Sequence, residues 1–302
     1  MKKIKLSSFF VFFATISATA IFPLPLVSCS EKAIEVNNAT DFLAAIENKE
    51  VKKIKLTDDI VFDNVADVAA IKLFDSKTIF CDKKNMHTIS AKWEHTNETD
   101  ASLMQISNTD PTKKLNIVLE NVKLTASHNT WSTLICVNNA LNTTLTIKHC
   151  DLSYAETQET GNVRGNALTI EETNIAKSGC KIDISNGSTL SGWSAIYNKG
   201  SYIALNATDS TFIGINDYPV QIEYGSPIYS FATIIMADYP ITTDRTGEVL
   251  HRRFSANNQF NFKNCKRYDI CIEKDVYPVS LMVKALDIDS LANKHWQYIE
   301  SE

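Results

Sequence analysis

Ile117-Val118-Leu119-Glu120-Asn121-Val122-Lys123-Leu124 is the stretch of this 302-residue chain that decides its fold. An apolar–x–apolar pair is followed by a polar corner residue and then by another alternating apolar segment. The order returns as Leu145-Thr146-Ile147-Lys148-His149-Cys150-Asp151-Leu152, and one residue longer as Ile182-Asp183-Ile184-Ser185-Asn186-Gly187-Ser188-Thr189-Leu190. Further versions are Ile203-Ala204-Leu205 through Ser210-Thr211-Phe212, and Phe260-Asn261-Phe262-Lys263-Asn264-Cys265. Alternation with period two, broken by Asn, Asp, Gly and Ser, predicts a recurring strand–turn–strand unit.

A second phrase alternates with the first. Its copies are Ala167-Leu168-Thr169-Ile170, Ala195-Ile196-Tyr197-Asn198, Pro219-Val220-Gln221-Ile222 and Asp269-Ile270-Cys271-Ile272. The steps from Leu168 to Ile196 and from Ile196 to Val220 are 28 and 24 residues. Unequal steps are compatible with a coil, because turns can lengthen without disturbing strands that stack.

This organisation predicts an all-β parallel β-helix. Helical periodicity is nearly absent between Val51 and Asp275, and several short strands in each step of about 20–30 residues suit such a coil. Each coil leaves an apolar inner face that only the next one covers, which explains the repetition. A β-sandwich also uses short alternating strands, but it does not need paired phrases in a fixed order. Leucine-rich repeats are disfavoured because the L-x-x-L-x-L signature is missing.

One copy carries a resemblance to a known group of proteins. Ser194-Ala195-Ile196-Tyr197-Asn198-Lys199-Gly200, followed by Ser210-Thr211-Phe212, resembles the G-A-I-Y-N-x-G … S-T-F repeat of right-handed parallel β-helix proteins. These include the pectate-lyase-like superfamily and bacterial β-helical surface adhesins. The resemblance covers roughly Lys52 to Lys274, with Ser194 in place of the usual glycine. It implies a right-handed solenoid and says little about activity.

Both open ends of such a solenoid need covers, because they expose strand edges. Residues Thr40–Lys49 are expected to form an N-terminal capping helix, because Phe42, Ala45, Ile46 and Lys49 fall at helical spacing and Asn38 or Thr40 can cap it. Leu281, Leu286, Leu291 and Trp296 within Val279–Ile299 predict a C-terminal helical cap. The alternative for this tail is a partner-binding helix. The expected organisation is therefore a parallel β-helix over 40–275 and a helical cap over 276–302.

The N-terminus has the form of an export signal. Lys2, Lys3 and Lys5 precede a run without charge from Leu6 to Leu26. A membrane-spanning helix, which needs about 20 apolar residues, is the alternative, but Pro23 and Pro25 would break it. The following Leu26-Val27-Ser28-Cys29 resembles the lipobox of bacterial lipoproteins. That resemblance implies a signal peptide over 1–28, a diacylglyceryl group on Cys29 and a short tether over 29–39.

The charge composition limits the classes of partner that the protein is expected to bind. The full chain has a net charge of −5, and removing residues 1–28, which hold three lysines and no acid, leaves 27 basic and 35 acidic residues, a net charge of −8. No basic stripe typical of nucleic-acid binders stands out, so we expect no nucleic-acid partner. For the same reason we expect no attraction to anionic lipid headgroups and attribute membrane attachment to the lipid. Of the six other cysteines, an even number would allow disulfides, but their apolar surroundings favour buried thiols.

An irregular excursion over 223–259 interrupts the repeat. It contains Arg245, Arg252 and Arg253, and its tyrosines include Tyr229 and Tyr239. Long excursions from a regular scaffold often carry function, and tyrosines can stack on sugar rings. These five residues are the predicted partner-binding residues. The alternative is a solvated hairpin without a role.

Chemistry is harder to find in the sequence. The N-T-D, D-D, G-H-G and R-I-K set of polygalacturonases is not present as a group; Asp58-Asp59 is an isolated match that we expect in a turn. Asp151, Asp183 and Asp209 recur near corners and could offer oxygen ligands to Ca²⁺, but their different offsets predict that they point in different directions. His149 aligns with Asn121 and Asn186, so we expect it to bond a turn. We predict no catalytic residues, no metal site and no cofactor.

Two functions remain open. The first is a non-catalytic, membrane-anchored surface or periplasmic lipoprotein, expected to be a monomer, that binds a glycan or protein along the flank of its β-helix. The second is a carbohydrate-active enzyme, a polysaccharide lyase or glycoside hydrolase, in which Ca²⁺ could take part. The enzyme alternative depends on fold analogy alone.

Overall fold

The computed structural model divides the chain into two units, Met1–Glu31 and Lys32–Glu302. It describes residues 32–65, 69–93, 101–127, 132–153, 165–171, 180–192, 194–200, 203–216, 221–223, 226–228, 234–238, 242–243, 249–251, 259–272 and 281–287. All of these residues belong to the second unit.

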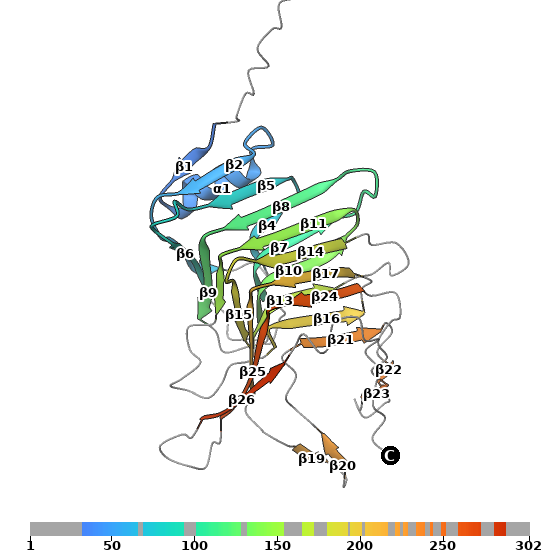
Figure 1. Cartoon of the computed structure of the whole chain (residues 1–302). Coiled ribbons are helices and arrows are strands. Elements are labelled where there is room, and N and C mark those ends of the chain that lie inside the picture. Colours follow the sequence, from blue (N-terminus) through green and yellow to red (C-terminus); the bar gives the residue numbers. More distant parts are fainter. Residues whose placement is uncertain are drawn as a thin grey trace, which may run out of the picture. The chain divides into compact units, whose positions relative to one another are not determined.

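Three sheets contain most of the described strands (Figure 1). Sheet A consists, in spatial order, of β1 (Ile34–Val36), β2 (Lys53–Leu56), β5 (Lys77–Phe80), β8 (Leu115–Glu120), β11 (Thr143–Lys148), β14 (Cys180–Ser185), β17 (Ile203–Thr208) and β24 (Gln259–Lys263). Sheet B consists of β3 (Ile60–Val65), β6 (His87–Trp93), β9 (Val122–Ser127), β12 (Asp151–Ser153), β15 (Thr189–Gly192), β18 (Thr211–Asn216), β25 (Lys266–Ile272) and β26 (Leu281–Asp287). Sheet C consists of β4 (Ala69–Leu73), β7 (Ala101–Asn108), β10 (Ser132–Ala140), β13 (Asn166–Glu171), β16 (Ile196–Gly200) and β21 (Ile234–Asp238).

The chain visits these sheets in a fixed order. From β2 to β18, a strand of sheet A is followed by one of sheet B and then by one of sheet C, and each strand of sheet A pairs parallel with the previous one. Within the three sheets, the described pairs are parallel except for β25 with β26. The prediction of an all-β chain built from stacked parallel strands is confirmed, and the order of visits is consistent with a parallel β-helix-like fold.

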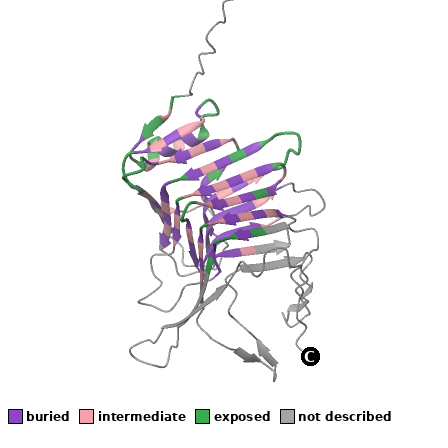
Figure 2. Cartoon of the chain, in the orientation of Figure 1, coloured by how far each residue is buried: buried purple, intermediate pink, exposed green. Residues whose placement is uncertain are grey.

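The first phrase stacks in the predicted register. Ile117 pairs with Leu145, Leu145 with Ile182, and Ile182 with Leu205. All four side chains are fully buried, and Figure 2 shows buried positions alternating along the strands of sheet A. Burying an aliphatic side chain of this size contributes about 1.5–3 kcal/mol. Each strand therefore supplies inward apolar residues to one continuous core and outward polar residues to solvent.

The structure explains why the Ala167 and Ala195 copies of the second phrase begin with two consecutive apolar residues. Leu168 pairs with Ile196, as predicted, and in each copy the preceding alanine is also fully buried. The successive amides of Ala167 and Leu168 donate to the successive carbonyls of Ser194 and Ala195, each over 3.1 Å. In a regular parallel strand, successive amides point to opposite sides. The chain thus bends at this pair, which allows two neighbouring side chains to face the core.

The predicted placement of two later copies of the second phrase is wrong. Ile196 pairs with Ile234 of β21 and not with Val220, which lies outside the described residues. Gln221–Glu223 is β19, which forms an antiparallel hairpin with β20 (Ser226–Ile228). The copy of the phrase that comes next after β18 in the sequence therefore ends in a hairpin. Sheet C is continued instead by the β-branched Ile234-Ile235. Asp269–Ile272 belongs to β25 and pairs with β18 in sheet B.

The predicted excursion over 223–259 is therefore not one irregular loop. It contains β21, a regular member of sheet C, and a second antiparallel hairpin of β22 (Thr242–Thr243) and β23 (Val249–His251). The chain leaves the stacked sheets twice and returns to them in between.

The N-terminal cap is confirmed as a helix. Helix α1 spans Ala39–Glu47, and the Asn38 side chain caps it by accepting from the Asp41 amide over 2.9 Å. Phe42, Ala45 and Ile46 are buried, as their spacing predicted. The predicted tether over 29–39 is too long, because Ile34–Val36 already forms β1 and pairs with β2. Val36 is buried and belongs to the core, so β1 extends the core by one strand beyond β2.

The C-terminal helical cap is wrong over the described residues. Leu281–Asp287 forms β26, which pairs antiparallel with β25 over seven positions. The outer edge of β25 would otherwise present unpaired backbone groups, and an antiparallel strand satisfies them. Residues 288–302, including Leu291 and Trp296, lie outside the described residues.

Candidate binding surface

The residues predicted to bind a partner lie outside the described residues. These are Tyr229, Tyr239, Arg245, Arg252 and Arg253, and the same holds for the predicted lipid attachment site, Cys29. Their roles stay predictions. Tyr229 directly follows β20 and Tyr239 directly follows β21, while the three arginines lie in sequence between or after β22 and β23, which form the hairpin described above.

A different surface is well defined, namely the outward side of sheet A from β8 to β24, called here the sheet A face. The outward residues of its central column follow one another in register from strand to strand: Val118, Thr146, Asp183, Asn206 and Asn261. They are half-buried or exposed, whereas both strand neighbours of Val118, Thr146, Asp183 and Asn206 are buried. Neighbouring strands are about 4.8 Å apart, so from Thr146 to Asn261 the column repeats polar groups at that spacing.

Contacts within the column hold its side chains in place. The Asn206 side-chain amide donates to Asp183 Oδ1 over 2.8 Å, and Lys181 Nζ lies 2.9 Å from the other carboxylate oxygen. Charged side chains on the sheet A face are Glu120, Lys148, Lys181, Asp183 and Lys263. With three lysines and two acids, the face offers hydrogen-bond donors and acceptors without a strong charge of either sign.

The corner between sheets A and B is a second repeated feature. The residue that follows five successive strands of sheet A has a positive φ: Asn121 (57°), His149 (49°), Asn186 (61°), Asp209 (50°) and Asn264 (53°). Asn and Asp adopt this left-handed conformation more readily than most residues. Side chains then link one corner to the next, as Asn264 Nδ2 does with Asp209 Oδ1 over 3.0 Å. His149 Nδ1 lies 3.1 Å from the carbonyl oxygen of Asn186, which confirms its predicted role in a turn.

The sequence analysis did not predict a role for the residue that directly follows the left-handed corner residue. Cys150, Ser210 and Cys265 are buried there, and each donates to the carbonyl oxygen two residues earlier, over 3.2, 2.9 and 3.5 Å. The recurring sequence signal is a small S–H or O–H donor directly after Asn, Asp or His. These side chains satisfy a backbone carbonyl where the sheet ladder is interrupted.

The cysteines support the expectation of buried thiols. Cys81, Cys136, Cys150, Cys180 and Cys265 are buried and free of disulfides, while Cys271 lies in β25, where side chains are not described. Burial raises the pKa of the Cys150 thiol to about 11. A thiol with this pKa is a poor nucleophile at neutral pH, so its role is packing and hydrogen bonding.

The three corner aspartates point to different places, as predicted. Asp183 lies on the sheet A face, Asp209 lies in the corner, and Asp151 lies on sheet B, where its carboxylate is 3.6 Å from Lys123 Nζ. Among the described residues, no group of three or more His, Cys, Asp or Glu side chains could hold a metal ion. Asp58 and Asp59 lie in the turn between β2 and β3, as expected.

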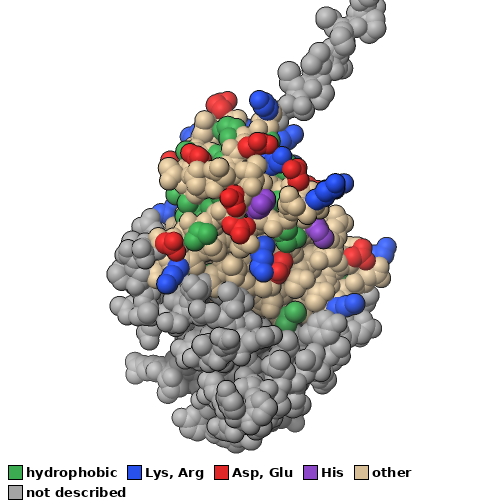
Figure 3. Space-filling view, turned by 90° about the vertical axis from the view of Figure 1, so that its left-hand side faces the viewer, with side chains coloured by type: hydrophobic (Ala, Val, Ile, Leu, Met, Phe, Trp, Pro, Cys, Tyr) green, Lys and Arg blue, Asp and Glu red, His purple; other side chains and the backbone are tan. Residues whose placement is uncertain are grey.

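One contact near that turn was not predicted. The Asp59 carboxylate accepts from the Thr88 amide over 2.7 Å and lies 3.7 Å from His87 Nδ1. Its side chain is 58% exposed, so solvent weakens this interaction. Figure 3 shows acidic, basic and histidine side chains interspersed over the side of the molecule that it presents. Outward residues of sheet B also stack in register, as Lys123, Asp151, Thr189 and Thr211 do.

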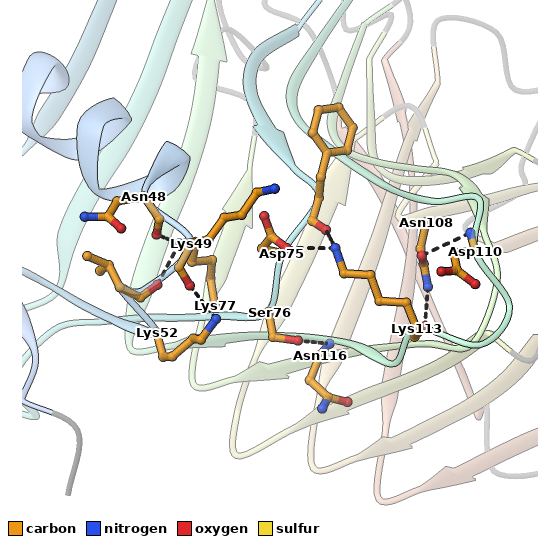
Figure 4. Close-up of polar contacts among 12 residues, drawn as sticks. Asn48, Lys49, Lys52, Asp75, Ser76, Lys77, Asn108, Asp110, Lys113 and Asn116 are labelled. Atoms are coloured by element: carbon orange, nitrogen blue, oxygen red, sulfur yellow. Dashed lines mark hydrogen bonds and ion pairs between the residues drawn. The ribbon is translucent and has the colours of Figure 1, made fainter.

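Lys77 is a buried lysine that sequence reasoning also missed. It is 2% exposed, and its ammonium donates to the carbonyls of Ala45, Asn48 and Val51 over 3.2, 2.7 and 2.6 Å. Burial lowers the pKa of Lys77, and the charge of Lys52 lowers it further, while Asp75 opposes the shift. A cation beside the carbonyl end of α1 favours the helix, so Lys77 joins the cap to the first coils (Figure 4).

Comparisons with protein-family models, with curated proteins and with solved structures find no match to this chain. Among the described residues, no helix has the length and apolarity needed to cross a membrane.

Proposed function

We propose that this protein is an exported lipoprotein held to a membrane by a lipid on Cys29. Its stacked sheets form a right-handed parallel β-helix, and its sheet A face binds an extended glycan or protein without chemical turnover. The observation that carries the proposal is the register of the central column, in which Thr146, Asp183 and Asn206 follow one another on successive strands.

The geometry of this face suits an extended partner. A column that repeats polar groups at about 4.8 Å can meet a chain-like ligand at several successive points. The residues beneath it, among them Leu145, Ile182 and Leu205, are fully buried in the core, and a close-packed core favours a preorganised site, which loses little conformational entropy on binding. The near-balance of charge favours hydrogen bonding over ionic attraction.

Immobilised neutral and acidic polysaccharides, probed with the mature chain with and without Ca²⁺, provide the test. We expect retention on at least one polymer, without new reducing ends and without the absorbance of unsaturated products. Turnover that disappears in Asp183→Ala or Asp209→Ala would contradict a binding function and favour the enzyme alternative. Absence of retention on every polysaccharide would leave only the protein partner of this proposal, which binding to host or bacterial surface proteins then tests.

A further inference from the structure

A group of lysines lies where sheet C leads into sheet A in the first coils. This lysine corner contains Lys49, Lys52, Lys77, Lys113 and Lys114, against the acids Glu50, Asp75 and Asp110. Lys113 Nζ donates to Asp75 Oδ1 and to the Phe74 carbonyl, each over 2.7 Å, and Lys52 Nζ donates to the Lys49 carbonyl. Figure 4 shows lysines of this corner grouped around Asp75.

The lysines are close enough to act on the same carboxylate. The hydrogen bond from Lys113 holds the pKa of Asp75 below its ordinary value of 3.8, and the charges of Lys49 and Lys77 add to the effect. The corner has a local charge of +2 in a mature chain of −8. It is therefore a positively charged region on a protein of negative net charge. The composition gives only the net charge and so did not indicate this region.

Two further features belong to the same place. The Phe74 side chain is 50% exposed directly before Asp75, and Phe is among the apolar side chains that membrane-surface segments bury at the boundary between headgroups and acyl chains. Lys49 and Lys114 are exposed, and 43% of the Lys113 side chain is exposed. An exposed aromatic ring beside exposed lysines combines the two side-chain types that favour an anionic membrane surface.

The predicted lipid attachment site, Cys29, is joined by a short segment to β1, which belongs to the same first coils as the lysine corner. Only four residues separate Cys29 from Ile34 at the start of β1, and extended chain spans at most about 3.5 Å per residue, or about 18 Å in all. β1 pairs with β2, whose first residue follows Lys52 directly. A lipid on Cys29 would therefore keep the first coils near the membrane surface.

We propose that the lysine corner, with Phe74, docks on anionic lipid headgroups and so orients the anchored molecule. This inference rests on the proposed function for the anchor, but the docking surface can be tested without the lipid. Docking of the first coils leaves the later strands of the sheet A face, β14 to β24, farther from the membrane and open to a partner.

Vesicle sedimentation of the mature chain from residue 29, made without lipid, tests the docking. We compare phosphatidylcholine vesicles with vesicles of phosphatidylcholine and phosphatidylglycerol in equal parts. The parent chain should bind only the anionic vesicles and should be released by added salt, because screening weakens exposed charges. Each lysine near the surface is worth about a five-fold change in binding, so Lys49→Gln/Lys113→Gln/Lys114→Gln should bind at least about ten-fold more weakly.

The matched control is Lys84→Gln/Lys92→Gln/Lys123→Gln, which makes the same change of net charge on sheet B and in the turn before β6. It should bind anionic vesicles like the parent. Equal loss in both triple variants would show that only net charge matters, and equal binding to neutral vesicles would also overturn the proposal. If the parent chain does not bind anionic vesicles, the docking proposal is wrong but the lipid anchor is not affected. The lipid anchor is tested separately, by Cys29→Ala in the full chain.

Discussion

His149 Nδ1 lies 3.1 Å from the carbonyl oxygen of Asn186, a residue 37 positions later in the chain. Both residues occupy the left-handed corner between sheets A and B, one coil apart. The contact shows how a corner side chain satisfies the next turn of backbone, in the place where the parallel ladder is interrupted. The same position holds Asn or Asp in the neighbouring coils, so the corner has a defined chemical requirement.

That requirement predicts the effect of substitutions at His149. His149→Val should lower the free energy of unfolding by about 1–2 kcal/mol, because a β-branched residue is strained at positive φ. His149→Asn should stay within about 0.5 kcal/mol of the parent, since asparagine fits this conformation. Urea unfolding measures both. Thr146→Val, three residues earlier in regular strand geometry, is the control. An equally stable His149→Val would show that the corner tolerates any residue.

Lys77→Met tests the buried ammonium. The variant keeps the length of the side chain but leaves the carbonyls of Ala45, Asn48 and Val51 without their donor, so we expect a loss of about 2–4 kcal/mol in thermal or urea unfolding. Lys84→Met, at an exposed position, should unfold like the parent. If both variants have the same stability, the three hydrogen bonds do not hold the cap.

Asp75 predicts a pH dependence on the acid side. Its pKa is lowered in the folded protein, so the folded state binds a proton less readily than the unfolded state does. The resulting stabilisation is present above the ordinary pKa of 3.8 and is lost as the pH falls through the lowered value. Asp75→Asn should therefore flatten the acid side of a stability–pH curve, while Asp63→Asn, at an exposed position of β3, should leave its slope closer to that of the parent. An unchanged slope in Asp75→Asn would contradict the pairing with Lys113.

Cys29→Ala tests the anchor in the full chain. Without the thiol no thioether can form, so we expect the protein to leave the membrane fraction or to accumulate unprocessed. Fractionation and intact-mass measurement distinguish these results from retention of a processed protein. Cys150→Ala, which removes a buried thiol, should still be processed and retained. A Cys29→Ala chain that is processed and retained like the parent would rule out the lipid.

The parts of the fold that could be predicted are those that repeat. Ile117, Leu145 and Ile182 stack as expected because alternation fixes which side of a strand faces the core, and Asn121 and His149 mark corners because few residues fit there. The N-terminal helix followed from the spacing of Phe42 and Ile46. These signals are local, so the sequence contains them directly.

The remaining features depend on contacts between distant segments. The hairpin of β19 and β20 separates Ile196 from its partner Ile234, and no local pattern limits the length of such an insertion. In the sequence, Lys77 resembles an ordinary exposed strand lysine. Only the folded structure brings its ammonium group to the backbone carbonyls at the end of α1. For the same reason the leucine spacing predicts a helix where β26 lies: the pairing with β25 is what makes this segment a strand.

Binding of an extended partner by the sheet A face can be tested with one pair of variants. Thr146→Arg places a large side chain in the middle of the central column, and Thr189→Arg makes the same change on the outward side of sheet B, where Thr189 pairs with Asp151 and Thr211. On whichever polymer or surface protein retains the parent chain, we predict that Thr146→Arg loses binding at least about ten-fold, or about 1.4 kcal/mol, while Thr189→Arg binds like the parent. Unchanged binding by Thr146→Arg, or loss only in Thr189→Arg, would contradict the account.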